Sequence, residues 1–326
     1  MLKATTRKRK VLSQSPEDDT EFLFTVSQMY YIEGKTQREI ADYFGISRPL
    51  VSQLLAAARA QGLVRVTVVD PATRFKGLED EMCSCFSLRR CKVTPSVPDP
   101  ERVRMRVAYA AACLFEDLIQ NGDVIGVGPG RSVSATVDLL NELRHATGLK
   151  VVPLAGGTPH VAGSRQVNEV ARDLAAKIHA ECFLLNAPLY VDDPSIARLL
   201  MTDPSIARST ELWDRISCAL VGIGALDAED PYFMARVRAS ESQEIVADFC
   251  GRFFTQDGQE AGGKFVVAIE PHQLRKAREV VAVAGGVSKA RAIRAILRGK
   301  LITTLVTDED TARAVLGLED GRGAGT

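Results

Sequence analysis

The sequence predicts an α/β protein with an N-terminal winged helix-turn-helix domain and a larger domain built on a doubly wound, mostly parallel sheet. Two observations predict this fold. Between residues 36 and 64, two short amphipathic patterns flank a glycine, and from residue 123 onward short apolar runs alternate with glycine turns and helical patterns. Apolar strands that alternate with helices are typical of a parallel sheet covered on both faces. The 326 residues are enough for two such domains.

The smaller domain is indicated by the stretch KTQREIADYFGISRPLVSQLLAAARAQGLV. Thr36 followed by Glu39 has the form of a capping box, and Gly45 suits the left-handed residue that ends a helix. Ser47 can then cap a second helix. The preceding stretch TEFLFTVSQMYYIEG predicts a further helix, and GLVRVTVVD predicts a strand or wing. Together these elements predict a winged helix-turn-helix over residues 20–70.

Seven polar residues of this domain are expected to contact double-stranded DNA. Side chains on the open face of the second helix suit base edges in the major groove, since arginine reads guanine and glutamine reads adenine. Side chains at the start of the preceding helix suit phosphates, which fix the register. The expected base-contacting residues are Ser47, Arg48, Ser52 and Gln53, and the expected phosphate-contacting residues are Thr36, Gln37 and Arg38.

Charge and composition bear on the possible partners of the chain and on its organisation. The 41 basic residues balance the 41 acidic ones, so only local clusters can indicate a nucleic-acid partner. The expected organisation is a disordered basic arm (1–19), the DNA-binding domain, a linker with a linking helix (71–98), an effector-binding domain (99–318) and a flexible tail (319–326). A merely solvated tail is the alternative for the basic arm.

The seven cysteines and the lack of a secretory or membrane-spanning pattern predict a protein of the reducing cytoplasm. Cys83, Cys85 and Cys91 could suggest a metal site. However, Cys83 and Cys85 lie two apart on an apparent helix and point to different faces. The four histidines show no ligand spacing either, so neither a metal nor a cofactor is expected.

Seven short apolar runs are candidate strands of the larger domain. In parallel sheets, ligands gather at the carboxyl ends of the strands, where loops and helix amino termini converge. Glycines concentrate after these runs, and they let backbone amides approach an anion closely. Glycines that merely end the strands are the alternative for any single pair. The runs are 123–128, 150–156, 182–188, 218–224, 264–270, 279–286 and 302–308.

The same loops carry donors suited to a phosphate or to sugar hydroxyls. Lys289 suits a phosphate, and a Schiff base with a carbonyl ligand is its alternative. The expected effector-contacting residues drawn from these loops are Gly128, Pro129, Gly130, Arg131, Ser132, Gly156, Gly157, Thr158, Arg165 and Lys289.

The loop GVGPGRS at 126–132 does not fit a nucleotide fingerprint. A dinucleotide site needs G-x-G-x-x-G and a carboxylate about twenty residues later, whereas here the next strand ends in PLAGGTP. No G-x-x-x-x-G-K-[ST] motif occurs either. An isomerase or deaminase acting on a sugar phosphate is the alternative function, but nothing in the spacing of Asp227, Asp248, Asp257 and His160 marks a catalytic dyad. The DNA-binding domain favours a sensor.

The hexapeptide DPSIAR occurs at 193–198 and again at 203–208. Each copy places Asp-Pro at a helix start, and Pro204 would interrupt one continuous helix. The repeat therefore predicts two consecutive short helices, which could form a flap or an oligomer contact or be a coincidental local duplication.

From about residue 20 to residue 318, the chain resembles the SorC family of sugar-binding transcriptional regulators. The resemblance is carried by YYIEGKTQREIADYFGISRPLVSQLLAAARAQGLV, GVGPGRSV, VVPLAGGT, NEVARDLAAKIHAECFLLNAPLYV, LVGIGAL, VADFCGRFFTQDGQ and VVAVAGGVSKARAIRAILRGKLITTLVTDEDTARAVL. It implies a homotetramer, a dimer of dimers, whose larger domain shares its fold with sugar-phosphate isomerases and deaminases but acts as a sensor for a sugar, sugar phosphate or polyol.

By this resemblance, the effector contacts fall on Gly128 to Ser132, Gly156 to Thr158, Asp248 and Lys289. Two residues depart from the pattern of the family. Pro129 stands where a bulkier residue, often tryptophan, is usual, and Ala247 replaces a frequent glycine. The identity and the phosphorylation state of the effector are therefore left open.

Overall fold

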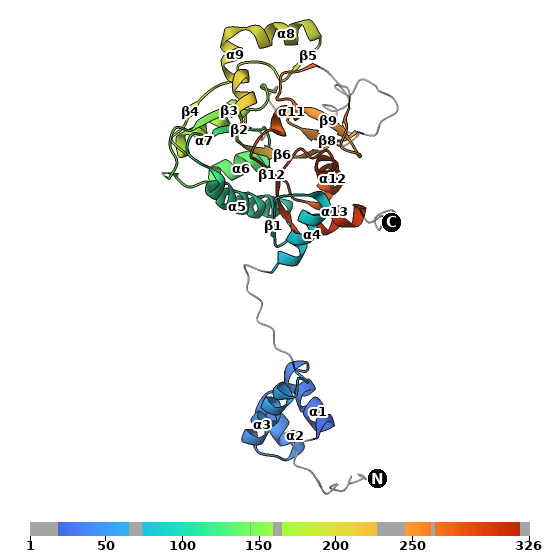
Figure 1. The fold of residues 1–326 in the computed structure, drawn as a ribbon. Helices are drawn as coiled ribbons and strands as arrows, with labels where there is room; N and C mark the ends of the chain where they lie inside the picture. The colour runs from blue at the N-terminus through green and yellow to red at the C-terminus, as the bar shows by residue number, and fades with distance from the viewer. Residues whose placement is uncertain are drawn as a thin grey trace. The chain divides into compact units, whose positions relative to one another are not determined.

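The computed structural model describes residues 19–64, 74–143, 145–158, 165–226, 245–261 and 265–319. The chain divides into two compact units, Met1–Pro71 and Ala72–Thr326 (Figure 1). Apart from their boundary residues Asp19 and Glu319, the expected basic arm and C-terminal tail lie outside the described residues.

The described residues of the smaller unit form three helices, α1 (Thr20–Tyr31), α2 (Gln37–Phe44) and α3 (Arg48–Ala60). The predicted capping box is confirmed, and Gly45 ends α2 with a left-handed φ of 67°. A core of aliphatic side chains from all three helices holds the unit together. Residues 65–70 of the expected wing strand lie outside the described residues.

The larger unit is built on a seven-stranded sheet in the order β1-β13-β12-β6-β2-β3-β4, in which all pairs are parallel. This arrangement confirms the predicted fold class. The strands are β1 (Arg90–Thr94), β2 (Val124–Val127), β3 (Lys150–Pro153), β4 (Glu181–Cys182), β6 (Cys218–Gly222), β12 (Glu279–Val283) and β13 (Thr304–Asp308).

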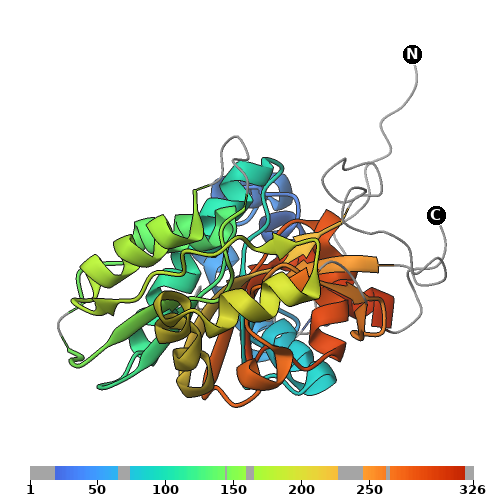
Figure 2. The ribbon, with the colours of Figure 1, turned by 90° about the horizontal axis from the view of Figure 1, so that it is seen from above.

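Helices cover both faces of this sheet, and successive residues of β12 show why. Val281 and Val283 lie in one apolar core, and Val280 and Ala282 in the other, because side chains of a strand alternate between faces. The first core lies under α5 (Pro100–Leu118), α6 (Arg131–Leu139) and α7 (Val167–Lys177). The second lies under α4 (Lys76–Phe86), α12 (Ala290–Arg298) and α13 (Glu309–Glu319). Figures 1 and 2 show the two helix layers, green on one side and mainly cyan and red on the other.

The stretch 71–98, expected to be a linker with a linking helix, contributes more than a connection. Its helix is α4, and Leu78, Met82 and Phe86 of α4 are buried in the core of the larger unit. The stretch also supplies β1, one of the two edge strands of the parallel sheet, which sequence patterning did not indicate.

Two of the candidate strands differ from the structure. The run 182–188 provides only the end of β4, and the run 264–270 provides β11 (Phe265–Val266), which pairs with β5 (Tyr190–Val191) in a separate antiparallel sheet. Short apolar runs do not specify their strand partner, so the pattern could not assign the sheet. A further antiparallel sheet contains β7 (Gly224–Ala225), β8 (Ile245–Phe249), β9 (Arg252–Thr255) and β10 (Glu260–Ala261).

The repeated hexapeptide forms two consecutive helices, as predicted. These are α8 (Pro194–Thr202) and α9 (Pro204–Thr210), and the carboxylates of Asp193 and Asp203 cap them by accepting from the amides two residues later. Each copy of the repeated sequence thus begins a helix with the same aspartate cap. The remaining short elements are η2 (Glu211–Arg215), α11 (Pro271–Leu274) and η3 (Val287–Lys289).

Candidate DNA interface and effector site

The open face of α3 carries the side chains that suit base edges. Val51, Leu54, Leu55 and Ala58 are buried against α1 and α2. The helical period therefore leaves Arg48, Ser52 and Gln53 exposed on the other side. Ser47, also exposed, has its Oγ occupied as the N-cap, accepting from the Leu50 amide at 3.3 Å.

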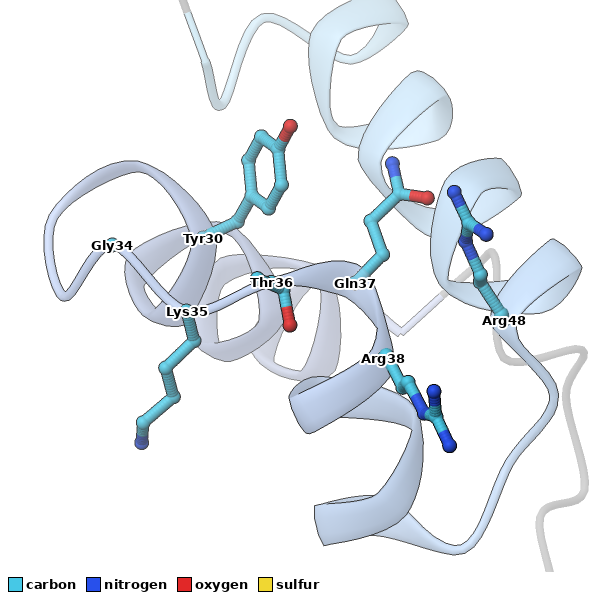
Figure 3. Close-up of a pocket in the computed structure, with 7 residues that line it drawn as sticks. All are labelled: Tyr30, Gly34, Lys35, Thr36, Gln37, Arg38 and Arg48. Carbon is cyan, nitrogen blue, oxygen red and sulfur yellow. The ribbon is translucent and has the colours of Figure 1, made fainter.

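Beside α3, the start of α2 borders an open cavity of about 570 Å³. Figure 3 shows the side chains of Gln37 and Arg48, the first residues of α2 and α3, both extending upward in the view. Three cations line the cavity, which gives it the character of a phosphate site. The lining residues are Tyr30, Gly34, Lys35, Thr36, Gln37, Arg38 and Arg48.

The Thr36 hydroxyl is already engaged. It donates to Glu39 Oε2 at 2.8 Å, and the same carboxylate oxygen accepts from the Thr36 amide at 2.7 Å. These hydrogen bonds hold the pKa of Glu39 below its ordinary value. Thr36 thus shapes the start of α2, and the donors left for a phosphate are those of Gln37 and Arg38.

Lys35 is a cavity residue that sequence reasoning missed. Its ammonium pairs with Glu33 at 2.8 Å and lies 5.5 Å from the ring centroid of Tyr43. The hydrogen bond to Glu33 raises the pKa of Lys35, so this cation keeps its charge. The sequence signal that could have indicated Lys35 is a basic residue directly before an N-cap.

In the larger unit, the chain order of the strands reverses between β2 and β6. From β2 the chain continues outward through β3 and β4, and from β6 it continues through β12 and β13 in the opposite direction. A crevice at the carboxyl ends of the strands forms at such a switch point and is the usual ligand site of open α/β sheets. The loop with Gly128, Pro129 and Gly130 leaves β2 at this position.

The loops after β2 and β6 are packed together. The Gly128 amide donates to the Leu220 carbonyl at 2.8 Å, and a Cβ at Gly128 would lie 3.4 Å from Cα of Val221. Gly130, with φ at 129°, then turns the chain into α6. Arg131 is exposed at the first position of α6 and Ser132 is buried behind it. The positive end of the α6 dipole and the Arg131 cation therefore occur together.

Lys289 reaches the same region from η3, in the loop that follows β12. Its side chain is half-buried. Burial lowers the pKa of Lys289, and the charges of Arg131 and Arg104 lower it further. Arg104 lies on α5, and nothing in its spacing indicated that its charge would act on Lys289.

Asp248 lies beside the loop after β6. Its strand β8 pairs with β7, and Asp248 is directly opposite Gly224. One carboxylate oxygen accepts from the Gly251 amide at 2.9 Å. The turn of the β8–β9 hairpin lies near the Gly128 loop, since a Cβ at Gly128 would lie 3.5 Å from Cys250 Sγ.

In the loop after β3, the glycine amides donate to carbonyl groups of the protein. The amides of Gly156 and Gly157 donate to the carbonyls of Val267 and Ala187, each at 2.8 Å. Gly156 is a glycine because a Cβ there would lie 2.7 Å from backbone atoms of Ala187 and Pro188. These two amides are therefore not available to an anion.

Two polar residues near this loop also have partners. The Thr158 carbonyl accepts from Gln166 Nε2 at 3.0 Å. The Arg165 guanidinium pairs with Asp138 at 2.6 Å and with Asp173, so its charge is already neutralised. The Gly128 loop lies near Cys250 of the β8–β9 turn, and the charge of Arg131 acts on Lys289. Arg165, by contrast, bridges α6 and α7.

In the described part of the chain, no helix is long and apolar enough to cross a membrane. Within the same residues, no three side chains of histidine, cysteine, aspartate or glutamate come together as a metal-ligand set. Cys83 and Cys85 lie on α4 and Cys91 lies on β1.

The two units define a class of protein, one that joins a helix-turn-helix to an α/β domain with a parallel sheet. Comparison with known proteins identifies the family. Residues 70–317 match the Sugar-bind family of sugar-binding domains, and residues 26–74 match the MarR family. The chain belongs to the SorC family of transcriptional regulators with a sugar-binding domain.

The chain is similar to named transcriptional regulators over almost its whole length. It is 29% identical to the sorbitol operon regulator of Klebsiella pneumoniae, over 92% of this chain and 98% of that protein. It is 30% identical to the transcriptional regulator LsrR of Klebsiella pneumoniae, over 92% and 94%. It is 27% identical to the erythritol catabolism regulatory protein EryD of Brucella abortus, over 93% and 99%.

Solved structures agree with this assignment. The crystal structure of the full-length sorbitol operon regulator SorC of Klebsiella pneumoniae has a TM-score of 0.68 at 28% identity and covers 92% of this chain and 99% of that chain. The predicted family and the prediction of a regulator rather than an enzyme are confirmed, because the relatives are transcriptional regulators.

Proposed function

We propose that α3 of this regulator reads operator DNA of a carbohydrate or polyol operon, and that an effector at the β2–β6 switch point alters that binding. The effector is a sugar, a sugar phosphate or a polyol. The observation that carries the proposal is the position of the Gly128 loop at the switch point, packed against β6, in a chain that also carries an exposed polar recognition face.

Arg48, Ser52 and Gln53 are assigned to base edges, with Ser47 capping the helix that presents them. Their exposure on a helix whose other side is buried supports this role. The phosphate contacts are assigned to Gln37, Arg38 and Lys35, while Thr36 orders the start of α2.

In the effector crevice, Arg131, Ser132, Asp248 and Lys289 are assigned to direct contacts, and the backbone of Gly128 to Gly130 shapes the floor. An anionic group suits Arg131 and Lys289, and the Asp248 carboxylate suits sugar hydroxyls. The loop of Gly156, Gly157 and Thr158 is assigned to the wall of the crevice, and Arg165 to holding α6 and α7 together.

Operator recognition requires more than one copy of the chain. Helix-turn-helix proteins bind half-sites spaced by about one turn of DNA, roughly 34 Å, and the spacing follows from their symmetry. We place the regulator in the cytoplasm as a homo-oligomer, a dimer of dimers, in which the effector changes the spacing of recognition helices. A ~100-fold difference in effector affinity between two arrangements corresponds to about 2.8 kcal/mol and is enough to switch occupancy.

The test is operator binding by the full chain. An operator is selected from a random pool of double-stranded DNA, and its affinity is measured by fluorescence anisotropy with and without a panel of sugars, polyols and their phosphates. The proposal requires sequence-specific binding that at least one compound changes. Sequence-specific binding that no compound in the panel changes would contradict the effector part, and binding without sequence preference would contradict the operator part.

A further inference from the structure

The outward face of α5 carries an apolar stripe with Tyr109 at its centre. Met105, Tyr109 and Cys113 are exposed and follow one another at intervals of four residues, so they share one face of the helix. Tyr109 is 62% exposed and Met105 is 40% exposed. The opposite face of α5 is buried in the core of the larger unit. One exposed apolar side chain is normal on a protein surface, but tyrosine and methionine are enriched in protein interfaces, and here they are aligned on one helix.

Charged residues of opposite sign lie at the two ends of this stripe. Arg102 and Arg106 lie on the N-terminal half of α5 and are exposed, whereas Glu116 and the exposed Asp117 lie in its last turn. A helix dipole favours acidic residues in the first turn and basic residues in the last turn. Glu101 follows this rule, but Arg102, Glu116 and Asp117 oppose it. The stability of α5 by itself therefore does not account for these charges, whereas an antiparallel helix of the same sequence would complement them.

The residues of this face are arranged symmetrically about Tyr109. Met105 and Cys113 lie four residues on either side of Tyr109, and Arg102 and Glu116 lie seven residues on either side. In an interface with two-fold symmetry, residue i contacts residue j of the partner and j contacts i. An antiparallel pair of α5 helices centred on Tyr109 would place Met105 against Cys113 of the partner subunit. It would also place Arg102 against Glu116 of the partner subunit.

We propose that α5 is a docking surface for a second copy of this chain, in which the two α5 helices pack antiparallel across a two-fold axis at Tyr109. The inference rests on the homo-oligomer proposed above and specifies one of its interfaces. The apolar stripe forms the dry centre of the contact, and two symmetry-related ion pairs between Arg102 and Glu116 set its direction. The Glu116 carboxylate already accepts from the Asn141 backbone amide at 2.6 Å, which limits its motion.

Cysteine cross-linking of the full-length protein tests the pairing directly. Met105→Cys should form a disulfide with the native Cys113 of a second copy. Within one helix these positions are about 12 Å apart, beyond the Cα separation of about 7 Å that a disulfide can span. The same distance should separate the two native Cys113 residues of a pair, so the wild type should not cross-link. Tyr109→Cys in a Cys113→Ser background should cross-link to its own copy.

A matched control separates this pairing from random collision. Arg172 is exposed on α7, so Arg172→Cys in the Cys113→Ser background places an accessible thiol on a neighbouring helix. All these proteins also carry Cys85→Ser, because Cys85 is exposed as well. Non-reducing electrophoresis should show a covalent dimer as the main product for the two α5 variants and not for the control.

Sedimentation of the full-length protein measures how much the stripe contributes to assembly. Tyr109→Glu should raise the dissociation constant of this dimer by roughly tenfold or more, because it places two like charges at the two-fold axis. Arg102→Glu should weaken the dimer as well, and the double substitution Arg102→Glu with Glu116→Arg should restore it. Arg172→Glu should leave the dissociation constant unchanged.

Three results would overturn the inference. The first is an oligomeric wild type whose α5 cysteine variants cross-link no more than the Arg172→Cys control. The second is a Tyr109→Glu protein with native circular dichroism and unchanged assembly, which would mean that the copies meet through another face. The third is a natively folded charge-swapped protein that fails to reassemble. Operator binding is measured in parallel, so that effector-sensitive binding by a protein that fails these tests would remove this inference and leave the proposed regulator function intact.

Discussion

The Asp308 carboxylate accepts a hydrogen bond from the Gly286 amide at 2.7 Å, joining the end of β13 to the loop that leads to Lys289. The same carboxylate accepts from the Thr311 hydroxyl at 2.6 Å and from the Ser96 hydroxyl at 2.9 Å. Asp308 is 2% exposed, so these partners replace its water. One buried carboxylate thus fixes the loop before Lys289, the start of α13 and the segment before α5.

Asp308→Asn should destabilise the fold and weaken the response to effector. The amide keeps one acceptor oxygen but places an NH₂ group against donors, so the free energy of unfolding should fall by about 1–3 kcal/mol. The measurement is urea unfolding of the full chain. The control is Asp310→Asn, an exposed position in the first turn of α13, which should change stability by less than about 0.5 kcal/mol. Equal effects of the two substitutions would contradict the assigned network.

Gly156→Ala and Gly157→Ala should have very different effects on stability. The new Cβ at position 156 would lie 2.7 Å from backbone atoms of Ala187 and Pro188, which cannot move independently. At position 157 the nearest atom is the flexible Gln166 Oε1 at 3.4 Å. We expect Gly156→Ala to cost about 1–3 kcal/mol and Gly157→Ala to be nearly neutral, by thermal and denaturant unfolding. A tolerated Gly156→Ala would show that the glycine is not required by close packing.

Gln53→Ala and Arg38→Ala should separate sequence readout from phosphate contact. Loss of a base contact should cost about 1–3 kcal/mol at one operator position and relax preference there. Loss of a phosphate contact should weaken all sequences alike and reduce the slope of log affinity against log salt by about 1. The measurement is anisotropy on the selected operator and on single-base variants at several salt concentrations. A uniform loss in Gln53→Ala would refute its assignment to a base edge.

The capping box at Thr36 should make the stability of the smaller unit depend on pH through Glu39. Hydrogen bonds from Thr36 lower the pKa of Glu39 in the folded state. The resulting stabilisation is complete above the pKa of the unfolded state and is lost as pH falls through the lower, folded-state pKa. Thermal unfolding of the wild type and Glu39→Gln between pH 7 and about pH 3 should show a stability difference that shrinks on acidification. A constant difference would contradict the role of the charged carboxylate.

Local patterns in the sequence predicted the smaller unit well. Thr36, Gly45 and Ser47 each act through atoms within three or four residues of themselves, so their caps follow from spacing alone. The parallel strands that end in glycine loops were also predictable, because a buried strand is a continuous apolar run.

Contacts between distant segments were not predictable. The partner of β11 is β5, and the amide partners of Gly156 and Gly157 come from other strands and loops, so nothing near these residues in sequence reveals them. Arg104 has an ordinary position on an amphipathic helix. Its charge acts on Lys289 because α5 packs beside the loop after β12.

The central claim is that a ligand in the crevice controls a separate DNA-binding unit, and Arg131→Ala tests it most directly. The measurement is the dissociation constant of the selected operator for wild type and Arg131→Ala, each with and without a saturating effector. We predict equal affinities of the two proteins without effector, and an effector-induced change of affinity in the wild type alone. An Arg131→Ala protein that responds like the wild type, or that no longer binds the operator, would contradict the claim.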